Sequence, residues 1–414
     1  MYNEYTDTEK GTINYWMPPV EHQYNSDKIL GLDLDWTLIK PKKGKVFPIN
    51  SEDWEFLIDE EGFDCLNSYL RMGYKIVVFT NQALIAKGKS YDMEGFKQRW
   101  DMIYSALSEK GIKSVYMLFA IRDDFYRKPC SGMWDFMVDK LNGNIKIAKK
   151  QCLFIGDAAG REKDHSAADL QFASNIGINF NVPEVVFGGD KSKGIMINVI
   201  KKRMNDAYSS GKMFNPMLYL EGFSDVRDEK VRRNRETFDE LKKQISLNKQ
   251  TLILFVGSPS SAKTSFYTQQ LLPYLEDQHQ TDKWVYLSQD TFDGTPAKFT
   301  KEVQTQLHAS KNIIIDNTNP TVANRKKYLG LDMSEDLVKI VIYFPIEKQV
   351  VMHLNSYRTK LINIGKLKNK ERVPTVAINS YWKRFEKVDK GGEGIDVYLE
   401  WEFIPNKENF SQFI

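Results

Sequence analysis

The amino-acid sequence predicts an α/β protein with two doubly wound parallel-sheet domains. A short apolar run, rich in β-branched or aromatic residues, ends abruptly in a polar, acidic or glycine-containing cluster eight times along the chain, and helix-sized stretches separate these runs. Continuous apolar runs of this kind are typical of parallel strands that are buried on both faces and joined by crossover helices. A length of 414 residues, at roughly 150 residues per domain, favours two sheets over one large sheet.

The predicted strands form two groups of four. They lie in residues 28–37, 74–82, 115–129 and 151–161, and then in residues 250–265, 283–293, 312–320 and 337–347. Residues 61–73 and 94–111 are helix-sized stretches between strands of the first group. The domain boundaries that follow are an extension at 1–29, a first domain at 30–205, a junction with a lead-in helix at 206–249 and a second domain at 250–414.

Composition excludes several classes of protein. With 42% hydrophobic and 13% aromatic residues, the bulk of the chain is neither disordered, collagen-like nor a coiled coil. The 58 basic and 55 acidic residues give a net charge of +3, which by itself does not indicate a nucleic-acid partner. Cys65, Cys130 and Cys152 are odd in number and widely spaced, so we expect a reducing compartment and neither disulfides nor a zinc cluster. No apolar run approaches the ~18 residues of a membrane span and the start is polar, so we expect an intracellular protein with no membrane partner.

The first strand end carries two carboxylates. Asp33 and Asp35 are two residues apart on an extended chain, so both can face one pocket. Close carboxylates require a cation, and Mg²⁺ would neutralise them and hold a phosphate beside them. One carboxylate could then attack phosphorus to give an aspartyl-phosphate, while the other protonates the leaving oxygen and later deprotonates water. The alternative is a solvated acidic turn, because an Asp-x-Asp-x-Thr string also arises by accident.

Three further strand ends favour the catalytic alternative. Thr80 and Asn81 close the second strand, Lys128 follows the third, and Asp157 follows the fourth. The carboxyl ends of parallel strands share one edge of a sheet, so we expect these side chains to lie together there. They supply a hydrogen-bond donor to phosphate, a positive charge that neutralises the phosphate, and a further metal ligand.

These motifs resemble a known family. DLDWTL, FTNQ, RKP and IGDAAGR resemble the four motifs of the haloacid dehalogenase-type phosphatases, and residues 30–187 are similar to the phosphatase half of the polynucleotide kinase 3′-phosphatase family. The resemblance implies that Asp33 is the nucleophile and a magnesium ligand. It also implies that Asp35 is the general acid and base, with its backbone carbonyl on the metal, and that Asp157 completes the metal site.

The same resemblance assigns the residues that contact the phosphate, and the sequence differs from the family pattern at one position. The residues implied to hold or support the phosphate are Thr80, Asn81, Lys128 and Arg161, with Asp164 as a nearby support. Trp36 departs from the small residue that the family usually has between the second aspartate and the threonine. A ring at this position would wall the pocket and alter how deeply a DNA end enters.

The second half of the chain opens with a strand, a tight loop and a helix start. In such an arrangement, backbone amides and a helix N-terminus surround the phosphates of a nucleotide, with a lysine on the outer phosphates and a threonine on Mg²⁺. The loop that would bind ATP in this way consists of Gly257, Ser258, Pro259, Ser260, Ser261, Ala262, Lys263 and Thr264. Ala262 stands where the strict motif has glycine, so a degenerate loop without nucleotide is the alternative.

Polar residues at neighbouring strand ends favour nucleotide binding. They are Asp290, Asp316, Asn317 and Arg325. These residues and the loop resemble the kinase half of the same family, so that the resemblance covers residues 30–403, phosphatase first and kinase second. It implies that Lys263 and Thr264 hold ATP phosphates and Mg²⁺, and that Asp290 activates the 5′-hydroxyl of a nucleic acid.

Arg358 falls where the family has a lid arginine that contacts ATP. Three departures keep a slow or lost kinase open as an alternative. They are Ala262, Gln289 in place of an arginine before the catalytic aspartate, and Ser356 in place of a second lid arginine. Only about thirty residues precede the first strand, so we do not expect a phosphopeptide-reading domain there.

Basic residues collect near the C-terminus. Residues 346–390 contain eleven lysines and arginines against four acids, interleaved with Tyr357, Tyr381, Trp382 and Phe385. Such a segment can pair with phosphates and stack on unpaired bases, although the alternative is a solvated helix whose aromatic side chains face the core. The basic runs at residues 40–45 and 201–203 indicate either nuclear localisation, phosphate contacts or plain exposed surface.

The sequence therefore predicts a bifunctional end-healing enzyme of DNA repair. A magnesium-dependent phosphatase would remove 3′-phosphate, and an ATP-dependent kinase would phosphorylate 5′-hydroxyl, at DNA or RNA ends that a ligase then joins. We expect a monomer, in the nucleus rather than the cytoplasm. A second hypothesis keeps the phosphatase and treats the kinase-like domain as a nucleic-acid-binding platform. A third is a non-catalytic end-binding scaffold.

Overall fold

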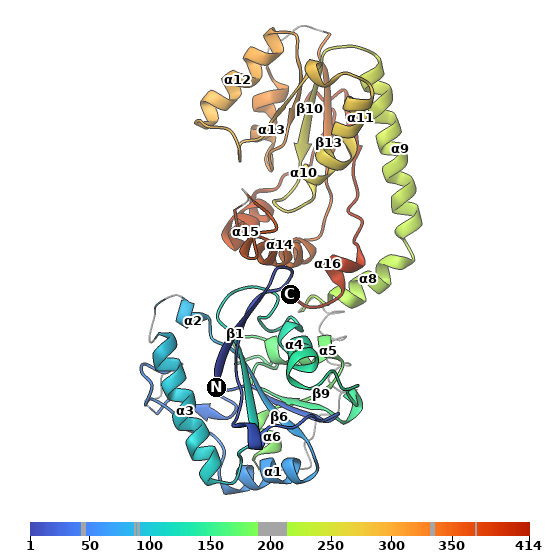
Figure 1. The fold of residues 1–414 in the computed structure, drawn as a ribbon. Coiled ribbons are helices and arrows are strands. Elements are labelled where there is room, and N and C mark those ends of the chain that lie inside the picture. The colour runs from blue at the N-terminus through green and yellow to red at the C-terminus, as the bar shows by residue number, and fades with distance from the viewer. Residues whose placement is uncertain (43–46, 87, 89–91, 189–212, 332–335, 369–370) are drawn as a thin grey trace. The chain divides into compact units, whose positions relative to one another are not determined.

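The chain folds into two compact units (Figure 1). The computed structural model describes residues 1–42, 47–86, 88, 92–188, 213–331, 336–368 and 371–414. The first unit comprises Met1–Asn215 with Tyr357–Lys370 and Gln412–Ile414, and the second comprises Pro216–Ser356 with Glu371–Ser411. Each unit has its own main sheet, which confirms the two-sheet α/β fold class that the sequence predicts.

The main sheet of the first unit has seven strands in the order β1-β2-β7-β6-β3-β8-β9. Their bounds are β1 (Tyr2–Asp7), β2 (Gly11–Trp16), β3 (Ile29–Leu32), β6 (Lys75–Asn81), β7 (Val115–Ala120), β8 (Leu153–Ile155) and β9 (Asn179–Asn181). From β7 to β9 all neighbouring strands are parallel. β3, β6, β7 and β8 are the four predicted strands of the first group. A separate antiparallel pair joins β4 (Ile39–Lys40) to β5 (Glu55–Phe56).

Helices cover both faces of this sheet. Their bounds are η1 (Val20–His22), α1 (Glu60–Arg71), α2 (Ala83–Ala86), α3 (Met93–Glu109), α4 (Gly132–Leu141), η2 (Lys149–Gln151), α5 (Ala168–Ile176) and α6 (Pro183–Val186). Val78 of β6 lies in the core that contains Trp100 of α3, whereas the next residue, Phe79, contacts Trp134 of α4 and Phe172 of α5. Because alternate strand residues enter opposite cores, the middle of the strand, residues 76–79, is continuously apolar.

The two predicted helices of this unit begin at aspartate caps. The Asp59 carboxylate accepts a hydrogen bond from the Gly62 amide at the start of α1, and the Asp92 carboxylate accepts one from the Gly95 amide at the start of α3. Such caps satisfy amides that have no partner within the helix. The buried side of α3 repeats every three or four residues, and its members are Phe96, Arg99, Trp100, Ile103 and Leu107.

The predicted N-terminal extension forms two strands of the sheet. β1 pairs with β2 and β2 pairs with β7, both antiparallel. β1 is polar and largely exposed, and it lies at the sheet edge, where a strand packs on few apolar neighbours. A polar edge strand lacks the apolar run that reveals a buried strand, which is why the sequence pattern does not show it.

The sheet of the second unit has five strands in the order β11-β12-β10-β13-β14, and all neighbouring strands are parallel. Their bounds are β10 (Thr251–Val256), β11 (Trp284–Leu287), β12 (Asn312–Ile315), β13 (Val338–Tyr343) and β14 (Val397–Glu400). The first four are the predicted strands of the second group. β14 is an edge strand that the sequence pattern does not reveal.

The helices of the second half include the predicted lead-in helix, α9. The bounds of the helical elements are α8 (Pro216–Ser224), α9 (Arg227–Ser246), α10 (Lys263–Phe266), η4 (Tyr267–Leu271), α11 (Leu272–Asp277), η5 (Thr281–Lys283), α12 (Pro296–His308), α13 (Val322–Leu329), α14 (Lys348–Asn363), α15 (Thr375–Arg384) and α16 (Lys407–Phe410). From Tyr357 onward, α14 and the turn after it group with the first unit.

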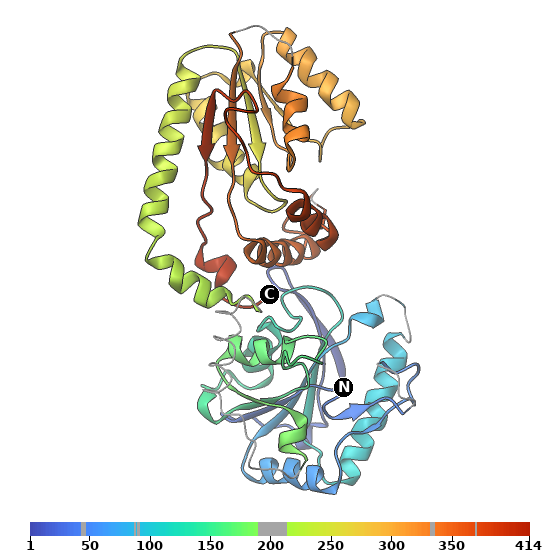
Figure 2. The same ribbon diagram turned by 180° about the vertical axis from the view of Figure 1, so that it is seen from behind.

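Two cores lie on the two faces of the second sheet. Ile253 of β10 packs with Leu241 of α9, whereas its neighbour Leu254 packs with Phe299 and Val303 of α12. Figures 1 and 2 show α9 and α11 on one side of this sheet and α12 and α13 on the other. This arrangement leaves the carboxyl edge of the strands for the loops that carry the predicted site.

Within the described ranges, no helix is both long enough and apolar enough to cross a membrane.

Candidate active sites

A buried lysine joins two carboxylates at the carboxyl edge of the first sheet. Asp33 follows the central strand β3, and its backbone amide donates to the Ile155 carbonyl of β8 at 2.9 Å. The Lys128 Nζ lies 2.7 Å from Asp33 Oδ1 and 2.7 Å from Asp169 Oδ1. The side chains of Lys128 and Asp169 are each 2% exposed. The lysine ammonium is therefore held by two charge-assisted contacts inside the protein.

Three carboxylates crowd around this lysine. One carboxylate oxygen from each of Asp33, Asp157 and Asp169 lies within 4.8 Å of the others. Burial raises the pKa of Asp33 well above its ordinary value; Lys128 opposes this rise, and the charges of Asp169 and Asp157 add to it. Burial and Asp169 raise the pKa of Asp157 to about 6. Because one ammonium does not neutralise three carboxylates, and oxygen donors suit Mg²⁺, the cluster fits a divalent cation.

Asp169 is a site residue that the sequence reasoning did not single out. It lies on α5, and its Oδ2 accepts a hydrogen bond from the Ala158 amide at 3.1 Å. A Cβ atom on Gly156 would lie 2.4 Å from this same oxygen, so glycine is required there for the carboxylate to approach. Its separation from Asp157 along the chain has no periodic signal, and only the fold brings the two carboxylates together.

Asp35 lies outside that cluster and has its own pair of donors. Its Oδ1 accepts from the Arg99 guanidinium at 3.1 Å, and its Oδ2 accepts from the Gln82 amide at 2.7 Å. The same Gln82 nitrogen lies 2.9 Å from the hydroxyl of Thr80. The predicted acid and base and the predicted phosphate-binding threonine are thus joined through one glutamine. Neither Arg99 nor Gln82 was among the predicted site residues.

Two of the predicted phosphate ligands contact the protein itself. Asn81 donates to the Lys128 carbonyl and accepts from the Lys128 amide, both at 3.0 Å, so its side chain holds the backbone of the lysine. Arg161 contacts the Asp164 carboxylate at 2.9 Å and the Asp157 carbonyl at 3.1 Å. The amide of Asn81 pairs with the Lys128 backbone, and its phosphate contact stays a prediction. Arg161 orders the loop after β8, and its phosphate contact stays a prediction.

The loop after β10 holds the predicted nucleotide-binding lysine. Lys263 begins α10, is buried, and its Nζ donates to the carbonyls of Gly257 at 3.1 Å and Ser258 at 2.7 Å. The hydroxyls of Ser258 and Ser260 are buried and have no hydrogen-bond partner among the described residues. Hydroxyls of this kind suit the oxygens of a phosphate group, so the loop fits the phosphates of ATP.

Ala262 adopts the backbone conformation of the glycine that it replaces. Its φ and ψ angles are 67° and 15°, in the left-handed region, and Ser260 has a φ of 59°. An L-residue in this region costs roughly 1–2 kcal/mol relative to the right-handed conformation. The loop thus has a turn of the kind that favours glycine, although alanine occupies the position.

Asp316 connects the loop to the neighbouring strands. Its Oδ2 accepts from the Thr264 hydroxyl at 2.7 Å and from the Tyr286 hydroxyl at 2.5 Å. Burial and the charge of Asp316 raise the pKa of the Tyr286 phenol. Asn317 Oδ1 accepts from the Gln289 amide at 2.9 Å, which joins the ends of β11 and β12. Asp290 follows directly and is exposed.

Arg325, predicted to support the kinase site, is bound within the core of the second unit. It is fully buried and forms a two-pronged ion pair with Glu393, at 2.6 Å and 2.8 Å. Its remaining donors contact the carbonyls of Asn319, Pro320, Glu386 and Lys387. A guanidinium with this many fixed partners is engaged by the fold, and it ties α13 to the segment before β14.

The basic C-terminal region is mixed in character. Tyr381 is 5% exposed and stacks on Phe385, which also stacks on Tyr343, so these aromatic side chains pack inward. Arg358 lies on the part of α14 that groups with the first unit, and its contact with ATP stays a prediction. Lys40 pairs with Glu55, and the run at 201–203 lies outside the described residues.

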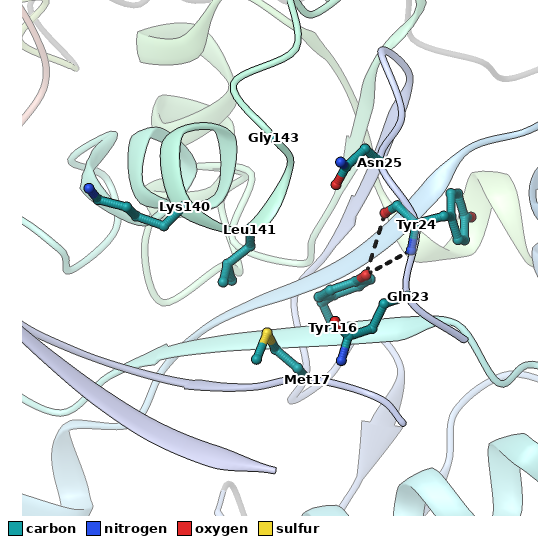
Figure 3. A pocket seen from close by; sticks show the side chains of 8 residues that line it. All are labelled: Met17, Gln23, Tyr24, Asn25, Tyr116, Lys140, Leu141 and Gly143. Atoms are coloured by element: carbon teal, nitrogen blue, oxygen red, sulfur yellow. Dashed lines mark hydrogen bonds between the residues drawn. The ribbon is translucent and has the colours of Figure 1, made fainter. Parts of the chain in front are cut away.

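A separate pocket lies in the first unit. Figure 3 shows it lined by Met17, Gln23, Tyr24, Asn25, Tyr116, Lys140, Leu141 and Gly143. The Tyr116 hydroxyl contacts the backbone amide of Tyr24 at 3.1 Å. None of the predicted site residues lines this pocket, so it takes no part in the two sites described above.

Comparisons with known proteins agree with this two-part organisation. A family model described as "Polynucleotide kinase 3 phosphatase" matches residues 28–187. The bifunctional polynucleotide phosphatase/kinase of Schizosaccharomyces pombe is 28% identical over 359 residues, which cover 87% of this chain and 76% of the relative. A putative bifunctional polynucleotide phosphatase/kinase of Acanthamoeba polyphaga mimivirus is 26% identical over 420 residues, with 93% and 89% covered. A polynucleotide 3′-phosphatase of Saccharomyces cerevisiae is 25% identical over 217 residues, with 41% of this chain and 91% of that protein covered.

Proposed function

We propose that this chain, which belongs to the polynucleotide kinase 3′-phosphatase family, prepares broken nucleic-acid ends for joining. The first unit removes a 3′-phosphate, and the second unit transfers the outer phosphate of ATP to a 5′-hydroxyl. The observation that carries the proposal is the cluster of Asp33, Asp157 and Asp169 around Lys128, with Asp35 held beside Thr80.

The phosphatase reaction uses two carboxylates in sequence. Asp33 attacks phosphorus and becomes an aspartyl-phosphate, while Asp35 protonates the 3′-oxygen of the leaving sugar. Asp35 then takes a proton from water, which hydrolyses the intermediate. Lys128 neutralises charge beside the nucleophile, and the Thr80 hydroxyl donates to the phosphate. Mg²⁺ bound by Asp33, Asp157 and the Asp35 carbonyl would supply further neutralisation of the phosphate oxygens.

The kinase reaction depends mainly on alignment. Lys263 and the serine hydroxyls of its loop hold the ATP phosphates, and the Thr264 hydroxyl, oriented by Asp316, would contact Mg²⁺. Asp290, exposed at the end of β11, accepts the proton of the attacking 5′-hydroxyl. A contact of Arg358 with ATP belongs to the same proposal and rests on the family resemblance.

A paired assay tests both activities on one substrate. A nicked duplex with 3′-phosphate and 5′-hydroxyl is incubated with magnesium and labelled ATP, with the parent protein, Asp33→Asn and Lys263→Ala. We expect Asp33→Asn to abolish phosphate release only, and Lys263→Ala to abolish label transfer only, because the two sites lie on separate sheets. A parent protein that releases phosphate without transferring label would favour the platform hypothesis, and one with neither activity would favour the scaffold.

The methyl group of Ala262 is the observation that favours a phosphatase with a kinase-like binding platform, and Ala262→Gly tests it. Because Ala262 already has a φ of 67°, we expect glycine to raise the free energy of unfolding by about 1 kcal/mol and to leave label transfer nearly unchanged. Denaturant unfolding and the labelled-ATP assay measure the two effects. A large rise in label transfer would mean instead that the methyl obstructs the nucleotide.

The remaining expectations belong to the same proposal. The enzyme acts in DNA repair, RNA ends being further substrates, and a ligase consumes its products. It works as a monomer in the nucleus, with Mg²⁺ and ATP as cofactors. The proposal assigns the phosphatase to residues 30–205 and the kinase to residues 250–414, beside which β1 and β2 extend the first sheet and α9 packs on the second.

A further inference from the structure

We infer that Arg99 and Gln82 are positioning residues that fix the orientation of Asp35 and link it to Thr80, an inference that rests on the proposed phosphatase function. Each oxygen of the Asp35 carboxylate has its own donor, Arg99 at 3.1 Å and Gln82 at 2.7 Å. A carboxylate held at both oxygens cannot rotate about its terminal bond without losing a hydrogen bond. The donors therefore decide which oxygen faces the reacting phosphate.

Arg99 is placed where a charged side chain is costly. It lies on the buried side of α3, among Phe96, Trp100, Ile103 and Leu107, and it is fully buried. Removing a guanidinium from water costs several kcal/mol, which a fixed carboxylate partner offsets only when the geometry is good. The carboxylate that Arg99 reaches is Asp35, whose side chain is 20% exposed. The Arg99 side chain thus extends from the core side of α3 to the Asp35 carboxylate at the carboxyl edge of the sheet.

Gln82 supplies the link to the phosphate-binding residue. Its side-chain nitrogen lies 2.7 Å from Asp35 Oδ2 and 2.9 Å from Thr80 Oγ1. Its backbone amide donates to the Ala120 carbonyl of β7 at 2.8 Å, so the residue is anchored at the strand end. One side chain therefore sets the distance between the proton donor and the phosphate-binding hydroxyl, which must both reach the same phosphate.

Two substrates with different leaving groups distinguish misplacement of Asp35 from a general loss of stability. A 3′-phosphorylated oligonucleotide loses a sugar alcohol, which needs a proton from Asp35, whereas p-nitrophenyl phosphate loses nitrophenolate, which needs none. We expect Arg99→Met to slow single-turnover phosphate release from the oligonucleotide by about 10²-fold, near the lower end of the range for general acid–base catalysis. The rate of the first-turnover burst of nitrophenolate should stay within about 3-fold of the parent rate. Later turnovers should slow, because hydrolysis of the aspartyl-phosphate needs Asp35 to activate water.

Three further variants complete the test. Arg99→Lys keeps the charge and should recover part of the lost rate, and Gln82→Met should slow oligonucleotide cleavage by about 10-fold with the burst retained. Ile103→Val removes one buried methyl group from the same side of α3, at a cost of about 1 kcal/mol, without touching Asp35. It should change neither substrate's rate at a temperature where all variants are folded by circular dichroism.

One set of outcomes would contradict the positioning role, and a different outcome would contradict the proposed phosphatase function. Equal losses on both substrates, or unchanged cleavage of the oligonucleotide by Arg99→Met and Gln82→Met, would overturn the positioning role while the parent stays active. A parent protein that releases no phosphate from the oligonucleotide would instead overturn the proposed phosphatase function.

Discussion

Buried cations in the first unit differ in what compensates their charge. Burial lowers the pKa of Lys128, but the adjacent carboxylates of Asp169 and Asp33 outweigh it and raise that pKa above the ordinary value. Lys75, at the start of β6, contacts the carbonyls of Tyr24 and Leu141 and the ring of Tyr116. These partners are dipoles and a π-system rather than anions, so burial dominates and lowers the pKa of Lys75 to about 7.

The Lys75 pKa predicts a specific pH dependence of stability. The folded value of about 7 lies below the ordinary 10.5, so between these pH values the unfolded chain binds more protons and the free energy of unfolding rises with pH. We expect the difference in unfolding free energy, parent minus Lys75→Met, to increase across this window by up to about 1.4 kcal/mol per pH unit. Denaturant titrations at several pH values measure it.

The exposed Lys113, just before β7, is the matched control for Lys75. Its side chain is exposed, so Lys113→Met controls for the loss of a lysine without the loss of a buried charge. A Lys75→Met difference that does not change with pH would mean that the buried ammonium keeps its proton throughout the window.

Among helices and strands, predictability followed the pattern of burial. Eight strands were predicted from continuous apolar runs, and all but β11, which lies at a sheet edge, are flanked by a strand on each side. β1, β9 and β14 were not predicted, because edge strands pack on fewer apolar neighbours and carry polar residues. β2 lies inside the sheet, but Thr12 and Asn14 interrupt its apolar residues, so it has no continuous apolar run. The pattern therefore located the strands that precede the predicted catalytic residues and missed strands that lack a continuous apolar run.

The Arg325–Glu393 pair shows that the position of a residue on its helix decides where its side chain lies. Arg325 was predicted at the kinase site because it follows a strand end rich in polar residues. In the fold, its α13 position directs the guanidinium into the core, where Glu393 and four carbonyls receive it. Burial raises the pKa of Glu393, but Arg325 and the Asp389 amide outweigh it and lower that pKa below its ordinary value. A charge satisfied in this way holds α13 against the segment before β14, and its support of the kinase site stays a prediction.

Over the full chain, segments distant in sequence complete the first unit. The last three residues, Gln412–Ile414, group with residues 1–215. Phe413 is 3% exposed, and its amide donates to Asn175 Oδ1 at 2.9 Å while its carbonyl accepts from Asn175 Nδ2 at 3.1 Å. The C-terminus is therefore a packed part of the phosphatase unit and is attached to α5, the helix that carries Asp169.

This attachment predicts that a C-terminal substitution destabilises the phosphatase. We expect Phe413→Ala to lower the free energy of unfolding of the first unit by about 3 kcal/mol, because a buried ring is replaced by a cavity. The loss of 3′-phosphatase activity with rising denaturant measures this change. Phe47 is 52% exposed in the same unit, so Phe47→Ala should shift the curve by less than about 0.5 kcal/mol. Equal shifts for the two variants would contradict the packed role of Phe413.

The sequence alone established the fold class, the central strands and the residues at their carboxyl ends, because apolar runs and local motifs are properties of neighbouring positions. The convergence of Asp169 with Asp33 and Asp157, and of Arg99 and Gln82 with Asp35, came only with the folded chain. The same is true of the pairing of Arg325 with Glu393. Such contacts join helices to strand ends far away in sequence, and their energies depend on burial and distance, which exist only once the layers have packed.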